Sequence, residues 1–308
     1  MLIEKERRNE ENNRVVSLAI ATRAAQKRLS ADQMFEQHED LAENKIRLED
    51  FTDSNLRSKV EALLLTLEYF DALVDTQYPN SIQTLKVFNL YNPEQLKEGD
   101  VLAPTIEEAK KILATQITTE QLEVIKKMEK PILQLIPITS IDRYVKAFNS
   151  YKPMKTQVDA DMSFCYSFIS EKADERDNVI NNAIIDWRIA LTEGTKEPKL
   201  LEGENDNSII LEKVKWFTRE FGRKGVTGVD LKRMLILMMW SLKEENPVNH
   251  YGGGTNRTKT ILNEEPRLYN TFFYMAWNSD SSRAKIGGPS VWNHFPGMRF
   301  RVSVMVDA

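Results

Sequence analysis

The chain contains one cysteine, Cys165, and three histidines, His38, His250 and His294. A single cysteine cannot form an intramolecular disulfide, and the apolar surroundings of Cys165, MSFCYSFI, favour a small core side chain over a reactive thiol. The histidines lie far apart in the sequence, and none belongs to an HExxH motif or to a zinc-ligand spacing. We therefore expect no metal site, no cofactor and a reducing compartment.

Long apolar segments are missing too. The run LILMMW at 235–240 is among the longest, and it is far shorter than the roughly 20 residues of a membrane-spanning helix. The first residues, MLIEKERRNEENN, mix charges of both signs, whereas a signal peptide has a basic start followed by an apolar stretch. We expect a protein without a membrane segment, located in the cytoplasm or, if its source is viral, in the virion.

Sequence signatures of catalysis are also absent. No GxSxG motif occurs, and the spacing of the carboxylates reveals no catalytic pair. The glycine loop at 249–259, NHYGGGTNRTK, is neither a Walker A sequence nor a GxGxxG turn after a strand. His250, at the start of this loop, is the nearest to a catalytic candidate. We predict that the protein is not an enzyme.

The net charge of −4 conceals an uneven distribution. From Lys213 to Ala308 there are 15 Lys and Arg against 8 Asp and Glu, a net of +7, while the preceding 212 residues carry −11. An acidic body joined to a basic C-terminal third fits either binding of a polyanion or head-to-tail self-association.

Composition predicts three parts. Residues 1–50 favour helix and contain no proline or glycine, but they have few apolar positions, so they form an N-terminal helical arm or extension. Residues 51–204 form an acidic helical body, and the polar stretch 195–207 is a linker candidate. Residues 205–308 form a basic, aromatic-rich lobe. We expect a mainly α-helical, two-lobed protein with a long N-terminal arm and a short C-terminal β-strand.

Within the body, apolar spacing predicts a helix that begins at about residue 54 and ends at Tyr78-Pro79-Asn80. The segment 81–93 fits a strand or a short helix equally well. Pro131 and Pro137 interrupt an apolar run, a short helix is predicted at Ile141–Phe148, and the pattern from 159 to 191 is helical with an interruption near 174–177. Two further helix starts carry capping boxes, namely Thr105 with Glu108 and Thr118 with Gln121.

The basic third begins with a predicted helix that ends at Gly222, followed by the turn GRKG and a second helix from Asp230 to Leu242. A helix-turn-helix reader needs exposed polar side chains on its second helix. Here that helix is apolar nearly all round after Arg233, which favours a buried core helix. We therefore do not expect sequence-specific DNA reading.

Phosphate contact asks only for positive charge and exposed backbone N–H groups, which the turn and the glycine loop offer. A solvated basic face and an ordinary surface loop are the alternatives. The predicted nucleic-acid-binding residues are Arg219, Arg223, Lys224, Lys232, Arg233, Arg257 and Lys259.

The last segments carry three further predictions. A helix starts at Asn263 and extends over the aromatic residues to Trp277, and 281–290 is a basic loop. Residues 299–306 alternate as a half-buried strand, with Phe300 and the valines on one face. A strand at a chain end needs an edge to pair with, and pairing with a neighbouring subunit is one possibility.

This layout of arm, acidic helical body and basic lobe resembles that of helical viral coat proteins and nucleoproteins. The resemblance covers organisation only, since no family motif is matched residue by residue, and it implies a homo-oligomer that sheaths single-stranded RNA or another polyanion. The first hypothesis is thus a structural protein that self-assembles through its arm. The alternatives are an interaction scaffold that assembles without nucleic acid, and an enzyme that acts on a phosphate-bearing substrate through the Gly252–Gly254 loop.

Overall fold

The computed structural model describes residues 54–151, 157–159, 163–195, 209–244, 250–251, 259–262, 273–278, 283–287, 292 and 298–308. The chain forms two compact units, residues 1–73 with 113–115, and residues 74–112 with 116–308. The predicted arm at 1–50 and nearly all of the predicted linker at 195–207 lie outside the described residues. Both β-sheets belong to the second unit.

The prediction of a mainly α-helical fold is wrong, because the described residues form a mixed α/β structure. A four-stranded antiparallel sheet has the order β1 (Pro131–Ile138), β3 (Asp186–Glu193), β10 (Val302–Asp307) and β4 (Thr227–Gly228). A second sheet has the order β2 (Gln157–Asp159), β8 (Arg283–Gly287), β7 (Tyr274–Asn278), β6 (Lys259–Ile261) and β9 (Met298–Arg299), with β5 (His250–Tyr251) also paired to β7.

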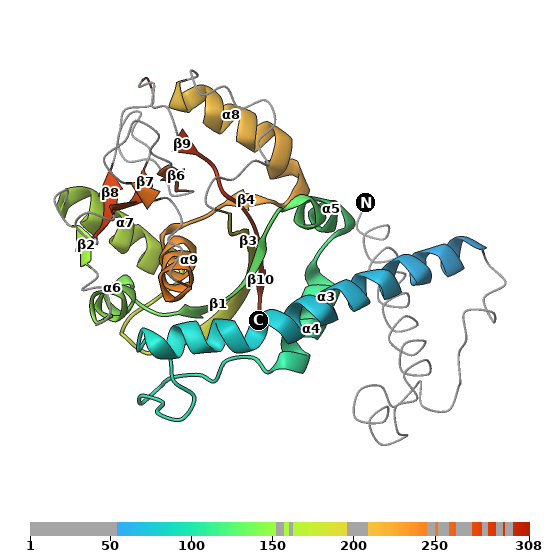
Figure 1. Cartoon of the computed structure of the whole chain (residues 1–308), viewed down its shortest axis with the longest axis horizontal. Helices are drawn as coiled ribbons and strands as arrows, with labels where there is room; N and C mark the ends of the chain where they lie inside the picture. Colours follow the sequence, from blue (N-terminus) through green and yellow to red (C-terminus); the bar gives the residue numbers. More distant parts are fainter. Residues whose placement is uncertain are drawn as a thin grey trace. The chain divides into compact units, whose positions relative to one another are not determined.

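Helices pack against both sheets (Figure 1). In chain order the helices of the described residues are α3 (Ser54–Val87), α4 (Ile106–Gln116), α5 (Thr119–Lys127), α6 (Ile141–Asn149), α7 (Ser163–Arg176), α8 (Ile210–Phe221), the short 3-10 helix η4 (Gly222–Lys224) and α9 (Leu231–Lys243). Both predicted capping boxes are confirmed, at Thr105 with Glu108 and at Thr118 with Gln121. The short helix predicted at Ile141–Phe148 is confirmed as α6.

The helix α9 is the central element of the second unit. Every residue from Leu231 to Leu242 is buried, and the helix contacts β1 and α6. The prediction of a buried core helix is confirmed. Asp230 is its N-cap and accepts a hydrogen bond from the Arg233 N–H.

The prediction that Pro131 and Pro137 interrupt the apolar run is wrong, because both prolines lie in the strand β1. The backbone N–H of Leu133 points away from β3, because it donates to the side chain of Gln77 on α3 (2.7 Å). Residues of one parity in an edge strand share this outward direction, so Pro131 and Pro137 also face outward. A proline at such a position removes no hydrogen bond from the ladder. The apolar run that the prolines appeared to break is therefore an edge strand.

The helix α3 also continues where it was predicted to end, passing through Pro79 to Val87. A proline inside a helix costs about 3 kcal/mol. Tertiary contacts on both sides of Pro79 offset this cost, because Gln77 donates to the Pro131 carbonyl (2.8 Å) and Ser81 to the Leu133 carbonyl (2.6 Å). These side chains cover the outward edge of β1.

The C-terminal strand β10 lies inside the sheet, with β3 along one side and β4 beside its first residues. The predicted strand is confirmed, but it is not half-buried, because residues on both of its faces are covered. Val302, Val304 and Val306 are buried on one face, and Ser303 is buried on the other, where its hydroxyl lies 2.8 Å from that of Thr192 in β3. Pairing between subunits through this strand stays a prediction, because β4 pairs with Val302 and Ser303 only, at the start of the second edge of β10 among the described residues.

Three further segments correct the helical prediction. The second half of the segment 159–191 is the strand β3, with Trp187 and Leu191 in its register. The aromatic stretch from Tyr274 to Asn278 is strand β7 instead of helix, and 283–287 is strand β8 instead of loop. The predicted helix start at Asn263 lies outside the described residues.

Candidate nucleic-acid interface

The helix α8 forms as predicted and ends at Gly222, which is its C-cap. Its buried face carries Ile210, Phe217 and Phe221, and the ring of Phe217 stacks on that of Phe300 at 4.4 Å between centroids. This packing fixes the helix on the C-terminal segment that leads into β10. The opposite face of α8, and the turn that follows it, are left toward solvent.

The basic turn Gly222–Gly225 is held against α5. The side chain of Gln121 on α5 donates to the Gly225 carbonyl (2.9 Å). Gly225 has φ +66°, which an L side chain rarely adopts, and a Cβ at this position would lie 2.8 Å from the Gln121 amide nitrogen. The glycine thus permits both the turn and its close approach to α5, which lies beside the end of α8 in Figure 1.

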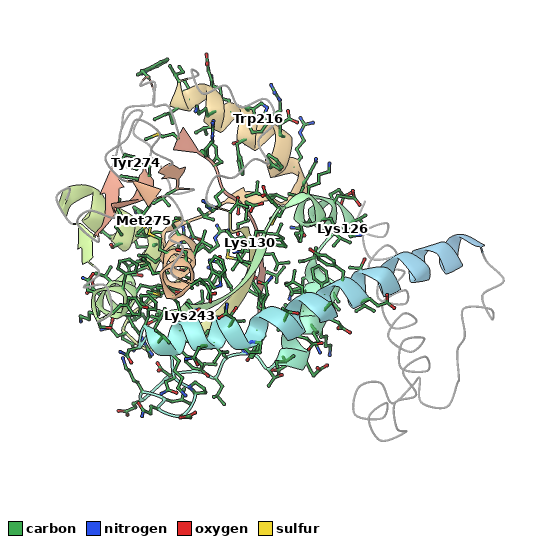
Figure 2. The ribbon with its side chains drawn as sticks, viewed as in Figure 1. Lys126, Lys130, Trp216, Lys243, Tyr274 and Met275 are labelled. Carbon is green, nitrogen blue, oxygen red and sulfur yellow. The ribbon has the colours of Figure 1, made fainter. Side chains whose placement is uncertain are left out.

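This contact holds together two parts of the chain that are about a hundred residues apart in sequence, and each part carries exposed cations. Arg219, Arg223 and Lys224 are exposed at the end of α8 and in the turn, and Lys126 and Lys127 are exposed in the last turn of α5. We call these five side chains the basic surface. Figure 2 labels Lys126 on the α5 side and Trp216 on the α8 side.

The basic surface contains some local compensation. Arg219 pairs with Glu220 at 2.9 Å, although its side chain is 69% exposed, so this ion pair is weak. Lys130, just after α5, lies over the ring of Trp240 at 4.6 Å from its centroid, and we do not count it in the basic surface. Arg223, Lys224, Lys126 and Lys127 are then the cations with most freedom to contact an external anion.

Sequence reasoning identified Arg219, Arg223 and Lys224 but missed Lys126 and Lys127. The two lysines lie in the predicted acidic body. A count of charges along the sequence does not reveal that their helix contacts the basic turn. The capping box at Thr118 correctly placed the start of α5. The same Gln121 makes the contact to Gly225, which involves a residue distant in sequence and has no local signature.

Lys232 and Arg233 were predicted on the polar rim of α9, and the structure places both in the interior at 2% exposure. The Lys232 ammonium lies 2.6 Å from Asp177, and Arg233 lies 3.1 Å from Asp230 and donates to the Gly228 carbonyl. A buried charge is tolerated when it is paired, and these two cations are paired internally. They are unavailable to an external phosphate, so they are excluded from the proposed interface.

The carboxylates and cations around Lys232 pair with one another. Asp177 also accepts from Arg188 (2.7 Å), and Arg188 reaches Asp307 at the end of β10 (3.1 Å). Burial alone would raise the pKa of Asp177, but Lys232 and Arg188 hold it below the ordinary value of 3.8. The cluster ties α7, α9, β3 and β10 together, which is a structural role.

Arg257 and Lys259 complete the predicted set. Arg257, with the whole of Gly252–Gly254, lies outside the described residues. Lys259 begins strand β6, where it pairs with Met298 of β9. The structure therefore does not bring Lys259 together with the basic surface through any contact of the described residues.

Other kinds of site find no support in the described ranges. No group of three or more His, Cys, Asp or Glu side chains in this part of the chain could hold a metal ion. No helix there combines the length and the apolar character that crossing a membrane requires. No protein family, curated protein or solved structure matches the chain.

Proposed function

We propose that the protein binds nucleic acid through its phosphates at the basic surface and that copies of the chain assemble on the strand as a sheath. The observation that carries the proposal is the Gln121–Gly225 contact, which holds the Gly222–Gly225 turn with its exposed cations against α5, whose last turn carries Lys126 and Lys127. Each cation that neutralises a phosphate releases condensed counterions, and this release drives binding.

The same geometry disfavours reading of base sequence. The second helix of the helix-turn-helix arrangement, α9, is buried from Leu231 to Leu242, so it cannot enter a groove of duplex DNA. The remaining exposed cations are suited to phosphates, which carry no sequence information. Binding is therefore strong at low salt and indifferent to sequence.

Assembly is the second part of the proposal, and it rests on the sequence of residues 1–50 and on the separation of charge along the chain. The C-terminal strand is already paired with β3 within its own chain, so the proposal of assembly does not rest on it. A scaffold that assembles without nucleic acid is the second candidate, favoured by the net of −11 on the first 212 residues, which could attract the basic surface of another copy.

Nucleic-acid binding is tested with double variants, each of which removes two positive charges from the basic surface. The double variants Arg223→Ala/Lys224→Ala and Lys126→Ala/Lys127→Ala each remove two cations. For a single-stranded RNA ligand, each pair should lower the slope of log K against log salt by about 1.4, since each phosphate contact contributes roughly 0.7. Titration of a fluorescent oligo(U) over a range of salt concentrations measures the slope.

The matched control removes two exposed lysines far from the turn in sequence and structure, Lys97→Ala/Lys146→Ala. It changes net charge equally and should leave the slope unchanged. Equal losses from the control and from the two test variants would show that total charge, and not the basic surface, governs binding. Absence of oligo(U) binding by the unaltered protein at low salt would contradict the proposal altogether.

A further inference from the structure

The helix α8 carries three aromatic side chains of unlike environment. Phe217 and Phe221 are buried, whereas Trp216 is half-buried. The ring of Trp216 meets that of Phe221 edge to face, with centroids 5.9 Å apart and planes at 78°. This contact supports the indole from the protein side while part of it stays accessible.

The accessible indole lies among cations. Lys215 precedes it, Arg219 is one helical turn further on, and both side chains are exposed. The exposed Arg223 follows in the turn. Two acidic residues of α8 lie one turn to either side, Glu212 and Glu220, and Glu220 pairs with Arg219. Arg219 belongs to the basic surface, so the ring of Trp216 lies one helical turn from that surface.

We propose that this combination selects single-stranded over double-stranded nucleic acid, with Trp216 as a platform on which one unpaired base stacks. The inference rests on the proposed function, which supplies the phosphate contacts. Bases in a duplex are stacked on each other and their faces are covered, whereas a single strand can turn a base toward an aromatic ring. An aromatic platform with adjacent cations serves any base, since every base has a π-face.

The experiment compares two ligands of equal length, oligo(U) and a duplex RNA, with three variants. Trp216→Leu removes the ring and keeps an apolar side chain against Phe221. It should weaken oligo(U) binding by roughly 5- to 150-fold and leave duplex binding unchanged. Trp216→Phe keeps a ring and should restore most of the loss. Tryptophan fluorescence should be quenched by oligo(U) in the unaltered protein, and this quenching should be reduced in both variants.

The control variant is Tyr151→Leu, which removes another half-buried ring, stacked on Phe88 at 4.2 Å and remote from the basic surface in sequence. It should change neither ligand's affinity. Thermal unfolding of each variant verifies that the fold persists.

The outcomes separate this inference from the function on which it rests. Equal weakening of oligo(U) and duplex by Trp216→Leu, or no weakening of either, would overturn the stacking platform while leaving phosphate binding intact. Failure of the unaltered protein to bind either ligand would overturn both proposals.

Discussion

At the scale of residues, the interior of this protein holds several charges in fixed pairs. Arg143 binds Asp100 through both terminal nitrogens, at 2.6 and 2.8 Å, with side chains that are 5% and 1% exposed. Arg301, the residue directly before β10 in the chain, is fully buried and donates hydrogen bonds to the Glu193 and Thr195 carbonyls. Burial lowers the pKa of Arg301 to about 10, so it keeps its charge at neutral pH. These side chains hold loops against strands.

The paired carboxylates predict a pH dependence of stability. Burial would raise the pKa of Asp100, Asp177 and Asp230, but hydrogen bonds and cationic neighbours hold all three below the ordinary 3.8. A lowered pKa means that the unfolded chain binds more protons, so stability is full above about pH 4 and is lost as the pH falls through the lower folded values. Urea midpoints measured from pH 7 down to pH 3 should decrease below pH 4.

The variant Asp177→Asn isolates one member of this set. It leaves the buried Lys232 with only the more distant Asp174, at 3.6 Å, and should cost up to about 3–5 kcal/mol at pH 7. The variant should also lose part of the acid dependence. A midpoint that is unchanged at pH 7, or an acid dependence as steep as that of the unaltered protein, would show that the cluster does not act in this way.

At the scale of elements, the sequence predicted what is encoded locally. The helices α6, α8 and α9 and both capping boxes were identified because their signals lie within a turn or two of the chain. The strands β1 and β3 were missed because the partners that define them are distant. Thr192 of β3, for example, is paired with Ser303 of β10, 111 residues away. Periodicity alone does not distinguish a strand buried on both faces from a piece of helix.

The side-chain amide of Gln77 covers the outer edge of β1, so its removal should lower the stability of the protein. Gln77→Ala removes the donor to the Pro131 carbonyl and the acceptor of the Leu133 N–H, and an unsatisfied buried group costs about 1–3 kcal/mol. The variant should unfold at lower urea and should self-associate more readily, because the edge of a sheet is opened. Urea titration and light scattering measure the two effects.

Gln83→Ala is the matched control for that variant, since Gln83 is exposed on the same helix. It should behave as the unaltered protein does. Equal stability of the two variants would show that α3 does not protect the strand.

In the proposed interface, too, only the residues that are marked by their own segment were predicted from the sequence. Lys126 and Lys127 join the basic turn through Gln121, which is a contact between distant residues, whereas Arg219, Arg223 and Lys224 could be named from their own segment. The burial of Lys232 and Arg233 depends on Asp177 and Asp230, of which only Asp230 is near in sequence. A helical wheel does not show whether a charged side chain is exposed, because it does not show whether a residue distant in sequence forms an ion pair with that side chain.

At the scale of the molecule, the four-stranded sheet combines strands from both sides of the predicted boundary at 205. The strands β1 and β3 precede it, and β4 and β10 follow it. The compact unit therefore joins part of the acidic body to the basic third, and the division into 1–50, 51–204 and 205–308 stays a prediction. Joining the two parts places α5 of the body against the turn of the basic third, as the proposed interface requires.

The most direct test of a nucleic-acid sheath is an electron micrograph of the purified protein together with its absorbance ratio at 260 and 280 nm. The proposal predicts regular particles whose absorbance ratio shows nucleic acid. It also predicts that a variant combining Arg223→Ala/Lys224→Ala with Lys126→Ala/Lys127→Ala loses that nucleic acid. Particles with the absorbance ratio of pure protein would indicate the scaffold instead, and a monomer without nucleic acid would contradict the proposed sheath.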